Sequence, residues 1–347
     1  MKPETMPQMK TGFLVAAAAL AGPLLAANLA AAETRIAYAN DWRWEGPAAP
    51  FLLALDRGYY AEEGLSVTMD TGQGSLEAIP RVASGTYQMG FADINSLIRF
   101  RDQNPELEVK AVLMVYSNPA FAIVGRKSLG IETPQDLEGK TLGAPATDGA
   151  FAQWAAFVDA NGIDASTVTI ENVGFPVREP MLAQGQVDAV TGFSFSSFIN
   201  LRGAGVPEED ITVLQMSDWG LELYGNVVIV NPDFAAESPE AVEGFIRATI
   251  RGLRETIDDP AAATEHVTAH NDVVTHDVEL ERLMLSLDGN YVTEEVRANG
   301  FGGIDEARFD RAVEQIALTY AFQNAPPEAS EIFDASYLPP QEERMLE

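Results

Sequence analysis

Residues 88–116, QMGFADINSLIRFRDQNPELEVKAVLMVY, contain a strand, a helix and a second strand in succession. Gln88–Asp93 and Val109–Tyr116 are β-type runs, and the second includes the apolar stretch AVLMV. Ile94–Asn104, between them, has helical patterning. This order is typical of a βαβ unit, and strands this apolar suit a parallel sheet that is covered on both faces.

The same alternation extends in both directions along the chain and predicts an α/β fold with mostly parallel sheets. The other expected strands are Arg35–Ala39, Leu65–Asp70, Phe121–Arg126, Thr141–Ala144, Val168–Val173, Val187–Phe193, Ile211–Met216 and Asn226–Asn231. The other expected helices are Ala49–Glu63, Ser75–Ser84, Gly149–Asn161, Arg178–Gln184 and Phe195–Gly203, with further helix starts at Thr133–Pro134 and Ser238–Pro239.

An internal similarity hints at two halves built alike. Gly85–Phe91 (GTYQMGF) resembles Gly185–Phe193 (GQVDAVTGF), and in each a helix ends at glycine before a strand runs toward a phenylalanine. Glycine suits such a helix end because it readily adopts positive φ. Two lobes with one plan would produce this similarity, and so would chance likeness between common helix–strand junctions.

The N-terminal segment has the layout of a secretory signal peptide. Lys2 and Lys10 precede a largely apolar run, Gly12–Ala32, which ends in three alanines. We expect residues 1–32 to be a signal peptide cleaved near Ala32, leaving about 315 residues, enough for two domains. A membrane anchor is the competing interpretation. Pro23, the high alanine content and the weak charge beyond the run argue against it.

Composition restricts the function further. The chain has no cysteine, which excludes a bacterial lipoprotein, a cysteine nucleophile and a thiolate metal site. Its net charge of −30 makes nucleic-acid binding very unfavourable, because phosphate contacts need a basic surface. The acidic residues are scattered, which favours a solvated acidic surface suited to a salty medium over a cationic-ligand site.

One segment resembles a known family. Ala54–Val67, ALDRGYYAEEGLSV, is similar to the A-x-x-x-G-Y-F-x-x-E-G-L-x-V segment of periplasmic solute-binding proteins of ABC importers. The branch it resembles handles sulfonates, taurine, nitrate and thiamine pyrimidine precursors. Further matches occur in the family's order at Gly72–Ser75, Ala83–Gly85, Gly90–Asp93, Asp136–Lys140 and Asp188–Ala189.

The resemblance implies a two-lobe periplasmic-binding-protein type II fold with two hinge crossings and a ligand cleft between the lobes. We expect the crossings near Tyr116–Phe121 and Tyr224–Asn226. Lobe 1 would then comprise residues 33–118 and 226–347, and lobe 2 residues 119–225. The implied protein is a soluble periplasmic monomer that captures a small organic molecule, a pyrimidine-like heterocycle or an alkyl sulfonate, and delivers it to an ABC permease in the inner membrane.

Two other functions stay open. Pyrimidine-synthesising relatives of this fold are enzymes, but their activity is intracellular, and the expected signal peptide argues against it. A ligand sensor that docks on a membrane receptor is not separable from a transport protein on these residues.

Ligands of α/β lobes sit at the carboxyl ends of strands and against helix N-termini. In the first half, these positions hold Trp42, Trp44, Gly74, Ser75, Asp93 and Asn95, and Tyr116 and Asn118 lie at the predicted hinge, within reach of the cleft. Flat indole faces favour planar or cationic ligands, and N–H groups at a helix start favour anions. The Asp41–Trp42 pair also resembles the pyrimidine-precursor branch, although the following Glu45–Ala48 departs from it. Helix capping alone would equally explain Ser75 and Asp93.

In the second half, the corresponding positions hold Thr147, Asp148, Phe175, Arg178, Phe193 and Ser194, and Tyr224 lies at the second predicted hinge crossing. Arg178 is the expected partner for an anionic ligand group, and an internal pair with Glu179 is the alternative. In Phe193–Ser197, aromatic rings alternate with hydroxyls, which suits a ligand wall.

We expect no catalytic residue, no metal and no cofactor. His266 and His270 have the i, i+4 spacing of some metal ligands but lack the H-E-x-x-H pattern, which favours a surface helix. Phosphate-loop, dinucleotide and nucleophile-elbow motifs do not occur in the sequence.

Overall fold

The structure is a computed structural model that describes residues 1, 3–4 and 33–346. It divides the chain into Met1–Ala32 and Glu33–Glu347, and the second unit is described below. The expected signal peptide therefore lies almost wholly outside the described residues. Within those residues, no helix is both long and apolar enough to span a membrane.

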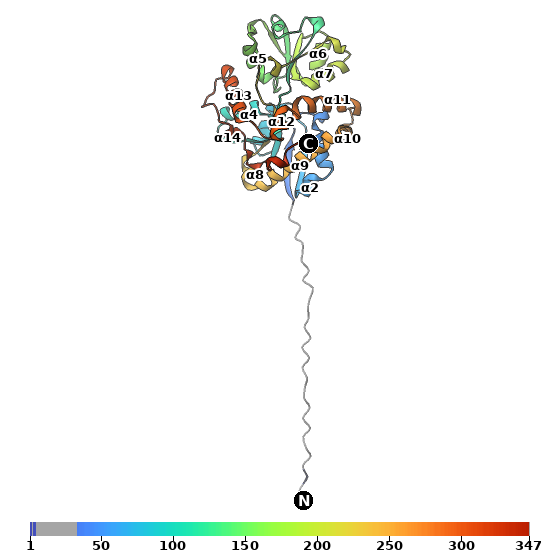
Figure 1. The fold of residues 1–347 in the computed structure, drawn as a ribbon, viewed down its shortest axis with the longest axis vertical. Helices are drawn as coiled ribbons and strands as arrows, with labels where there is room; N and C mark the ends of the chain where they lie inside the picture. The colour runs from blue at the N-terminus through green and yellow to red at the C-terminus, as the bar shows by residue number, and fades with distance from the viewer. Residues whose placement is uncertain (2, 5–32, 347) are drawn as a thin grey trace. The chain divides into compact units, whose positions relative to one another are not determined.

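Two five-stranded sheets form the framework (Figure 1). The first has the order β2-β1-β3-β10-β4, and the second has the order β7-β6-β8-β5-β9. The first sheet is built from β1 (Thr34–Ala39), β2 (Leu65–Asp70), β3 (Met89–Asp93), β4 (Lys110–Met114) and β10 (Asn226–Val230). The second is built from β5 (Phe121–Arg126), β6 (Thr141–Ala144), β7 (Thr169–Asn172), β8 (Ala189–Phe193) and β9 (Ile211–Gln215).

The sheets share one plan, and both are mixed. In each, a single strand runs against the other four: β10 is antiparallel to β3 and β4, and β5 is antiparallel to β8 and β9. The prediction of mostly parallel sheets is correct for four of the five strands in each sheet. It did not include the fifth, antiparallel strand. The two similar segments precede corresponding strands, β3 and β8. Their glycines, Gly85 and Gly185, have φ of 74° and 69°.

Helices surround both sheets. Before β10 these are α1 (Ala49–Asp56), α2 (Tyr59–Glu62), α3 (Ser75–Ala83), α4 (Ile94–Gln103), α5 (Trp154–Asn161), α6 (Arg178–Ala183) and α7 (Ser194–Gly203). After β10 come α8 (Pro232–Glu237), α9 (Pro239–Asp258), α10 (Pro260–His270), α11 (His276–Ser286), α12 (Glu294–Asn299), α13 (Glu306–Thr319) and α14 (Ala329–Ile332). In Figure 1, α5, α6 and α7 surround the second sheet.

Three predicted helices differ from those observed. The helix expected over Ala49–Glu63 is divided into α1 and α2, because Gly58 adopts φ of 77° between them. The start expected at Thr133 opens only a short 3-10 helix, Pro134–Leu137, capped by Thr133 and Asp136. The α-helix expected from Gly149 begins later, at Trp154, after a 3-10 turn.

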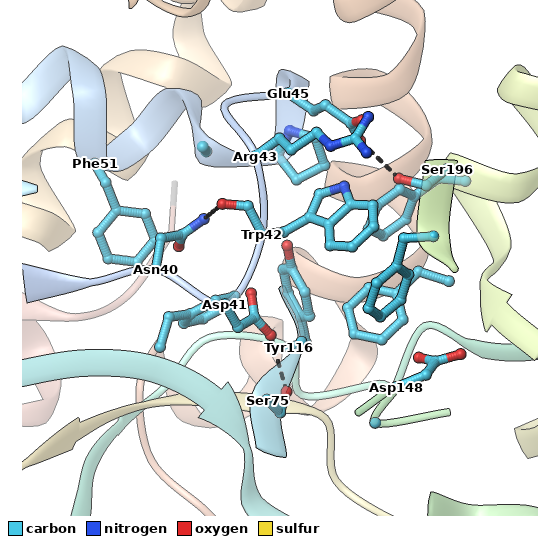
Figure 2. A pocket seen from close by; sticks show the side chains of 18 of the residues that line it. Asn40, Asp41, Trp42, Arg43, Glu45, Phe51, Ser75, Tyr116, Asp148 and Ser196 are labelled. Carbon is cyan, nitrogen blue, oxygen red and sulfur yellow. Dashed lines mark hydrogen bonds between the residues drawn. The ribbon is translucent and has the colours of Figure 1, made fainter. Parts of the chain in front are cut away.

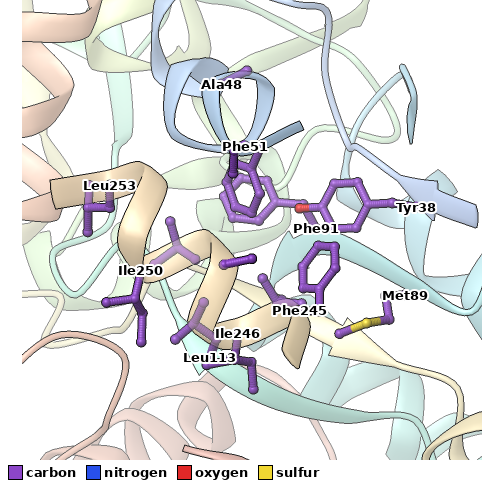
Figure 3. Close-up of a cluster of buried hydrophobic side chains, with 14 of the residues drawn as sticks. Tyr38, Ala48, Phe51, Met89, Phe91, Leu113, Phe245, Ile246, Ile250 and Leu253 are labelled. Atoms are coloured by element: carbon purple, nitrogen blue, oxygen red, sulfur yellow. The ribbon is translucent and has the colours of Figure 1, made fainter. Parts of the chain in front are cut away.

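The long helix α9 covers the first sheet with the apolar stripe that its spacing predicts. Phe245 on α9 stacks on Tyr38 of β1, with ring centroids 5.4 Å apart (Figure 3). Phe245 also stacks on Tyr60 of α2, with ring centroids 4.8 Å apart. Gly252 lets α9 approach α1 closely, since a Cβ there would lie 2.3 Å from the Pro50 carbonyl oxygen. This packing holds α1, and the loop before it, in place beside β1.

The chain passes between the two sheets twice, through residues 115–120 and 216–225. The passages contact each other: the Gly225 N–H donates to the Tyr116 carbonyl at 2.9 Å. A Cβ at Gly225 would lie 2.8 Å from that same oxygen, so only glycine fits there. The expected crossings fall on these two passages.

Candidate ligand-binding site

A cavity lies between the two sheets (Figure 2). Residues up to 118, called the first half below, and residues 119–225, called the second half, both line it. From the first half come Asn40, Asp41, Trp42, Arg43, Glu45, Pro47, Ala48, Phe51, Gly74, Ser75, Phe91 and Tyr116. From the second half come Asp148, Gly149, Phe175, Arg178, Phe193, Phe195 and Ser196. Most of these residues follow strand ends or open helices, the location at which α/β sheets bind ligands.

Seven of the lining residues are aromatic. Trp42, after β1, meets Phe175, after β7, edge to face with ring centroids 4.7 Å apart. Tyr116 makes edge contacts with Phe91, Phe193 and Phe195 at 5.4, 6.5 and 6.2 Å. The cavity therefore presents ring faces and edges from both halves of the chain, an environment that favours a flat apolar ligand.

Asp41 is the buried acid of the first half. Ser75 Oγ and Asn226 Nδ2 donate to its Oδ2 at 2.9 and 2.7 Å, and in Figure 2 its other oxygen points away from Ser75. Burial raises the pKa of Asp41 from 3.8 to about 7, although both hydrogen bonds oppose the rise. Asp41 can thus accept a hydrogen bond when charged and donate one when protonated.

This pKa predicts a pH-dependent stability. Between about pH 4 and 7 the folded protein keeps a proton on Asp41 that the unfolded chain has released, so the stability from this group falls as pH rises through that window. We expect Asp41→Asn to gain roughly 4 kcal/mol in unfolding free energy, relative to wild type, between pH 4 and pH 8. Denaturant unfolding at both pH values measures this gain. The control is Asp218→Asn at an exposed aspartate, and equal pH dependence in the two variants would contradict the assignment.

Arg178 lines the cavity but is bound within the protein. Its Nε and Nη2 donate to Glu179 Oε1 at 2.9 and 2.6 Å, and its Nη1 lies 3.6 Å from Asp148 Oδ2. All three side chains are at most 5% exposed. Arg178 therefore forms the internal pair with Glu179, the alternative to ligand binding. Two carboxylates already neutralise the guanidinium that we expected to bind an anionic ligand group.

Eight of the fifteen predicted residues line the cavity: Trp42, Gly74, Ser75, Tyr116, Asp148, Phe175, Arg178 and Phe193. The other seven, which do not line it, are Trp44, Asp93, Asn95, Asn118, Thr147, Ser194 and Tyr224. Each of the seven has a structural contact instead.

Three of the seven belong to a buried network beneath the cavity. Asp93 caps α4 by accepting from the backbone N–H groups of Asn95 and Ser96. The Asn95 amide donates to Asp93 and to the Tyr224 carbonyl, both at 2.7 Å. The Tyr224 hydroxyl, in turn, donates to Glu295 at 2.6 Å. The capping interpretation of Asp93 thus describes what the structure shows.

The other four make contacts outside the cavity. Trp44 is partly buried against the core, and its carbonyl accepts from Asn271 at 2.8 Å. Asn118 donates to the Gly289 carbonyl at 3.0 Å, and Thr147 donates to the Gln73 carbonyl at 2.8 Å. Ser194 opens α7, and its N–H donates to the Ala120 carbonyl at 2.8 Å.

Several lining residues are absent from the predicted set, among them Asp41, Arg43, Glu45, Phe51 and Phe91. Arg43 and Glu45 stand in the same loop as Trp42, so position after a strand was a usable signal. Phe51 on α1 and Phe91 in β3 are indistinguishable by pattern from core residues. Glu45 also joins the two halves, since Ser196 Oγ donates to its Oε2 at 2.9 Å.

Comparison with known proteins agrees with this architecture. The chain is 26% identical to the riboflavin-binding protein RibY of Chloroflexus aurantiacus, over 84% of this chain and 82% of that protein. It is 26% identical to a formylaminopyrimidine-binding protein of Halalkalibacterium halodurans, over 79% of this chain and 82% of that protein. It is also 26% identical to the 4-amino-5-hydroxymethyl-2-methylpyrimidine phosphate synthase of Aspergillus parasiticus, over 67% of this chain and 69% of that protein.

A solved structure shares the fold. The alkanesulfonate-binding protein SsuA of Xanthomonas axonopodis pv. citri, bound to MOPS, superposes with a TM-score of 0.66. The match covers 89% of this chain and 98% of that one at 14% identity, and so it concerns the fold alone. The α/β two-lobe periplasmic-binding-protein fold predicted from the sequence is confirmed. Residues 47–263, more than half of the chain, match the family described as NMT1/THI5 like, and the chain belongs to that family.

Proposed function

We propose that the protein is an extracytoplasmic solute-binding protein that captures a planar nitrogen heterocycle, pyrimidine-like or flavin-like, and delivers it unchanged to an ABC importer. The two relatives named as riboflavin- and formylaminopyrimidine-binding proteins support this class of ligand. Under this proposal residues 33–118 and 226–347 form one lobe and 119–225 the other. The sheet composition supports that division.

The observation that carries the proposal is the aromatic cavity between the two sheets. Trp42 and Phe175 come from opposite lobes and lie 4.7 Å apart between ring centroids, so a flat ligand that enters contacts both lobes at once. Asp41 supplies a hydrogen-bonding group for a ring N–H or ring nitrogen beside these aromatic faces. A ligand that touches both lobes stabilises the closed arrangement by its differential affinity for it.

The charges disfavour an alkyl sulfonate as the buried group. The inner cavity is lined by Asp41, Glu45 and Asp148; of its two arginines, Arg178 is already paired with Glu179 and Asp148, and Arg43 is exposed. A sulfonate placed there would meet carboxylates without an available buried cation, which carries a large desolvation cost.

A pyrimidine-synthesising enzyme is the second candidate, since such a synthase is among the relatives. Among the described residues that line the cavity there is no histidine or lysine to supply acid–base or imine chemistry. His266 and His270 lie on α10 and both bond Asp56, at 2.7 and 2.9 Å. These observations favour binding without conversion.

A thermal-shift screen tests the ligand class. Riboflavin and 4-amino-5-hydroxymethyl-2-methylpyrimidine represent the two rings, and taurine represents the sulfonates. A bound ligand at 100 times its dissociation constant should add about 2.7 kcal/mol of stability, so a ring compound that binds raises the melting temperature by several degrees. Stabilisation by taurine alone, or by none of the three compounds, would contradict the proposal.

A further inference from the structure

A second cavity adjoins the aromatic one and has a different charge. Arg43, Glu45 and Phe175 line both cavities, so the two meet along these three residues. The remaining charged residues that line the second cavity are Glu179, Arg202 and Arg282. Three arginines and two glutamates thus surround this space, in a chain whose net charge is −30.

Arg43 differs from the other arginines of these walls. Arg178 is paired with Glu179, Arg202 with Glu281, and Arg282 with Glu279 at 3.0 Å. Of the two acids nearest to Arg43 in sequence, Asp41 accepts from Ser75 and Asn226, and Glu45 accepts from Ser196 and lies 3.5 Å from Arg282. Among the described residues, Arg43 has no ion pair and no hydrogen bond, and its guanidinium carbon lies 5.3 Å from the centroid of the Trp42 ring.

A second unpaired donor lies beside Arg43. Trp42 Nε1 is buried and has no hydrogen-bond partner among the described residues. In Figure 2 the indole nitrogen faces the Arg43 side chain, which extends past the ring toward Glu45 and Ser196. A buried N–H without an acceptor is costly, and a guanidinium binds oxyanions through paired donors. The buried indole N–H therefore lacks an acceptor within the described part of the chain, and the exposed guanidinium beside it is available to bind an oxyanion where the two cavities meet.

We propose that Arg43 and Trp42 Nε1 together bind an anionic substituent of the ligand, such as a phosphate, carboxylate or sulfonate, while its ring occupies the aromatic cavity. This inference rests on the proposed function and narrows its ligand to a heterocycle that carries a negatively charged tail. The inner cavity holds the uncharged ring beside Asp41, and the tail lies at the outer cavity, where the cation is unpaired.

The test uses two pairs of compounds that differ only in a phosphate: riboflavin with flavin mononucleotide, and 4-amino-5-hydroxymethyl-2-methylpyrimidine with its phosphate ester. Calorimetric titration gives the affinity of each. For the ring that binds, we expect the wild-type protein to prefer the phosphate ester by about tenfold, the strength of one charged hydrogen bond near the surface. High salt should reduce this preference because Arg43 is exposed.

Variants assign the preference to the two donors. Arg43→Gln should reduce the ester-to-alcohol ratio to less than about threefold, and Trp42→Phe, which keeps an aromatic face but removes the N–H, should also reduce it. Arg35→Gln removes an equal charge from an exposed site on β1 and should keep the wild-type ratio.

The outcomes separate the inference from the proposed function. If a ring compound binds but its phosphate ester binds no more tightly, the inference is wrong and the proposed function stands. If the wild-type preference persists in Arg43→Gln, another group binds the tail and the inference is again wrong. If none of the four compounds binds, the proposed ligand class fails and the inference fails with it.

Discussion

Replacing Trp42 with alanine is expected to weaken binding of the ring ligand by at least about 30-fold, while Trp44→Ala changes it less than about threefold. Trp42 lines the cavity and contacts Phe175 across it, and a buried tryptophan at the centre of a binding site contributes roughly 2 kcal/mol or more. Trp44 lies two residues away and packs against the core instead. Calorimetric titration of both variants with the ring compound measures the difference.

Stability provides the matched control for this pair. Trp44→Ala should lower the unfolding free energy by roughly 1–3 kcal/mol, because it removes a partly buried side chain from the core cluster. Trp42→Ala should cost less stability in the absence of ligand. Equal losses of affinity in the two variants would mean that the tryptophans act through the fold of their loop rather than through contact with the ligand.

Arg178→Ala is expected to lower the unfolding free energy by roughly 3–5 kcal/mol, because Asp148 and Glu179 would remain buried without their cation. Urea unfolding without ligand measures this effect. Arg311→Ala, which breaks an exposed pair with Glu222, is the control and should leave the unfolding free energy nearly unchanged.

A second substitution checks the cause of that loss. Adding Glu179→Gln to Arg178→Ala removes one uncompensated carboxylate and should recover part of the stability. If Arg178→Ala instead unfolds like the wild type and loses affinity only for an anionic ligand, Arg178 is a ligand residue and the structural role given to it here is wrong.

The local sequence pattern predicted a helix or a strand well where one type of signal, helical or β, dominated the segment. Leu65–Asp70 and Phe121–Arg126 are strands with the expected bounds. The break at Gly58 depends on a positive φ, which a sequence pattern permits without requiring. The antiparallel course of β5 and β10 depends on where the chain passes between the sheets, and strand composition carries no direction.

The sequence predicted which loops reach the site, but not which way the side chains of those loops point. Position after a strand identified the Trp42 loop, yet Trp42 and Trp44 separate in the structure, one to the cavity and one to the core. Arg178 was singled out for its chemistry, while its neighbour Glu179 in the chain is also its partner in space. Arg43 is recognised as a candidate ligand residue only because, among the described residues, the surrounding arginines are paired and Arg43 is not. Sequence alone does not show these pairs.

A flat heterocycle should occupy this aromatic cavity and leave it unchanged. Equilibrium dialysis against riboflavin and the pyrimidine, followed by mass spectrometry of the compound recovered from the protein compartment, distinguishes binding from conversion. We predict that at least one ring compound concentrates with the protein and is recovered at its original mass. Recovery at a changed mass, or equal concentrations of both compounds on the two sides of the membrane, would contradict the account.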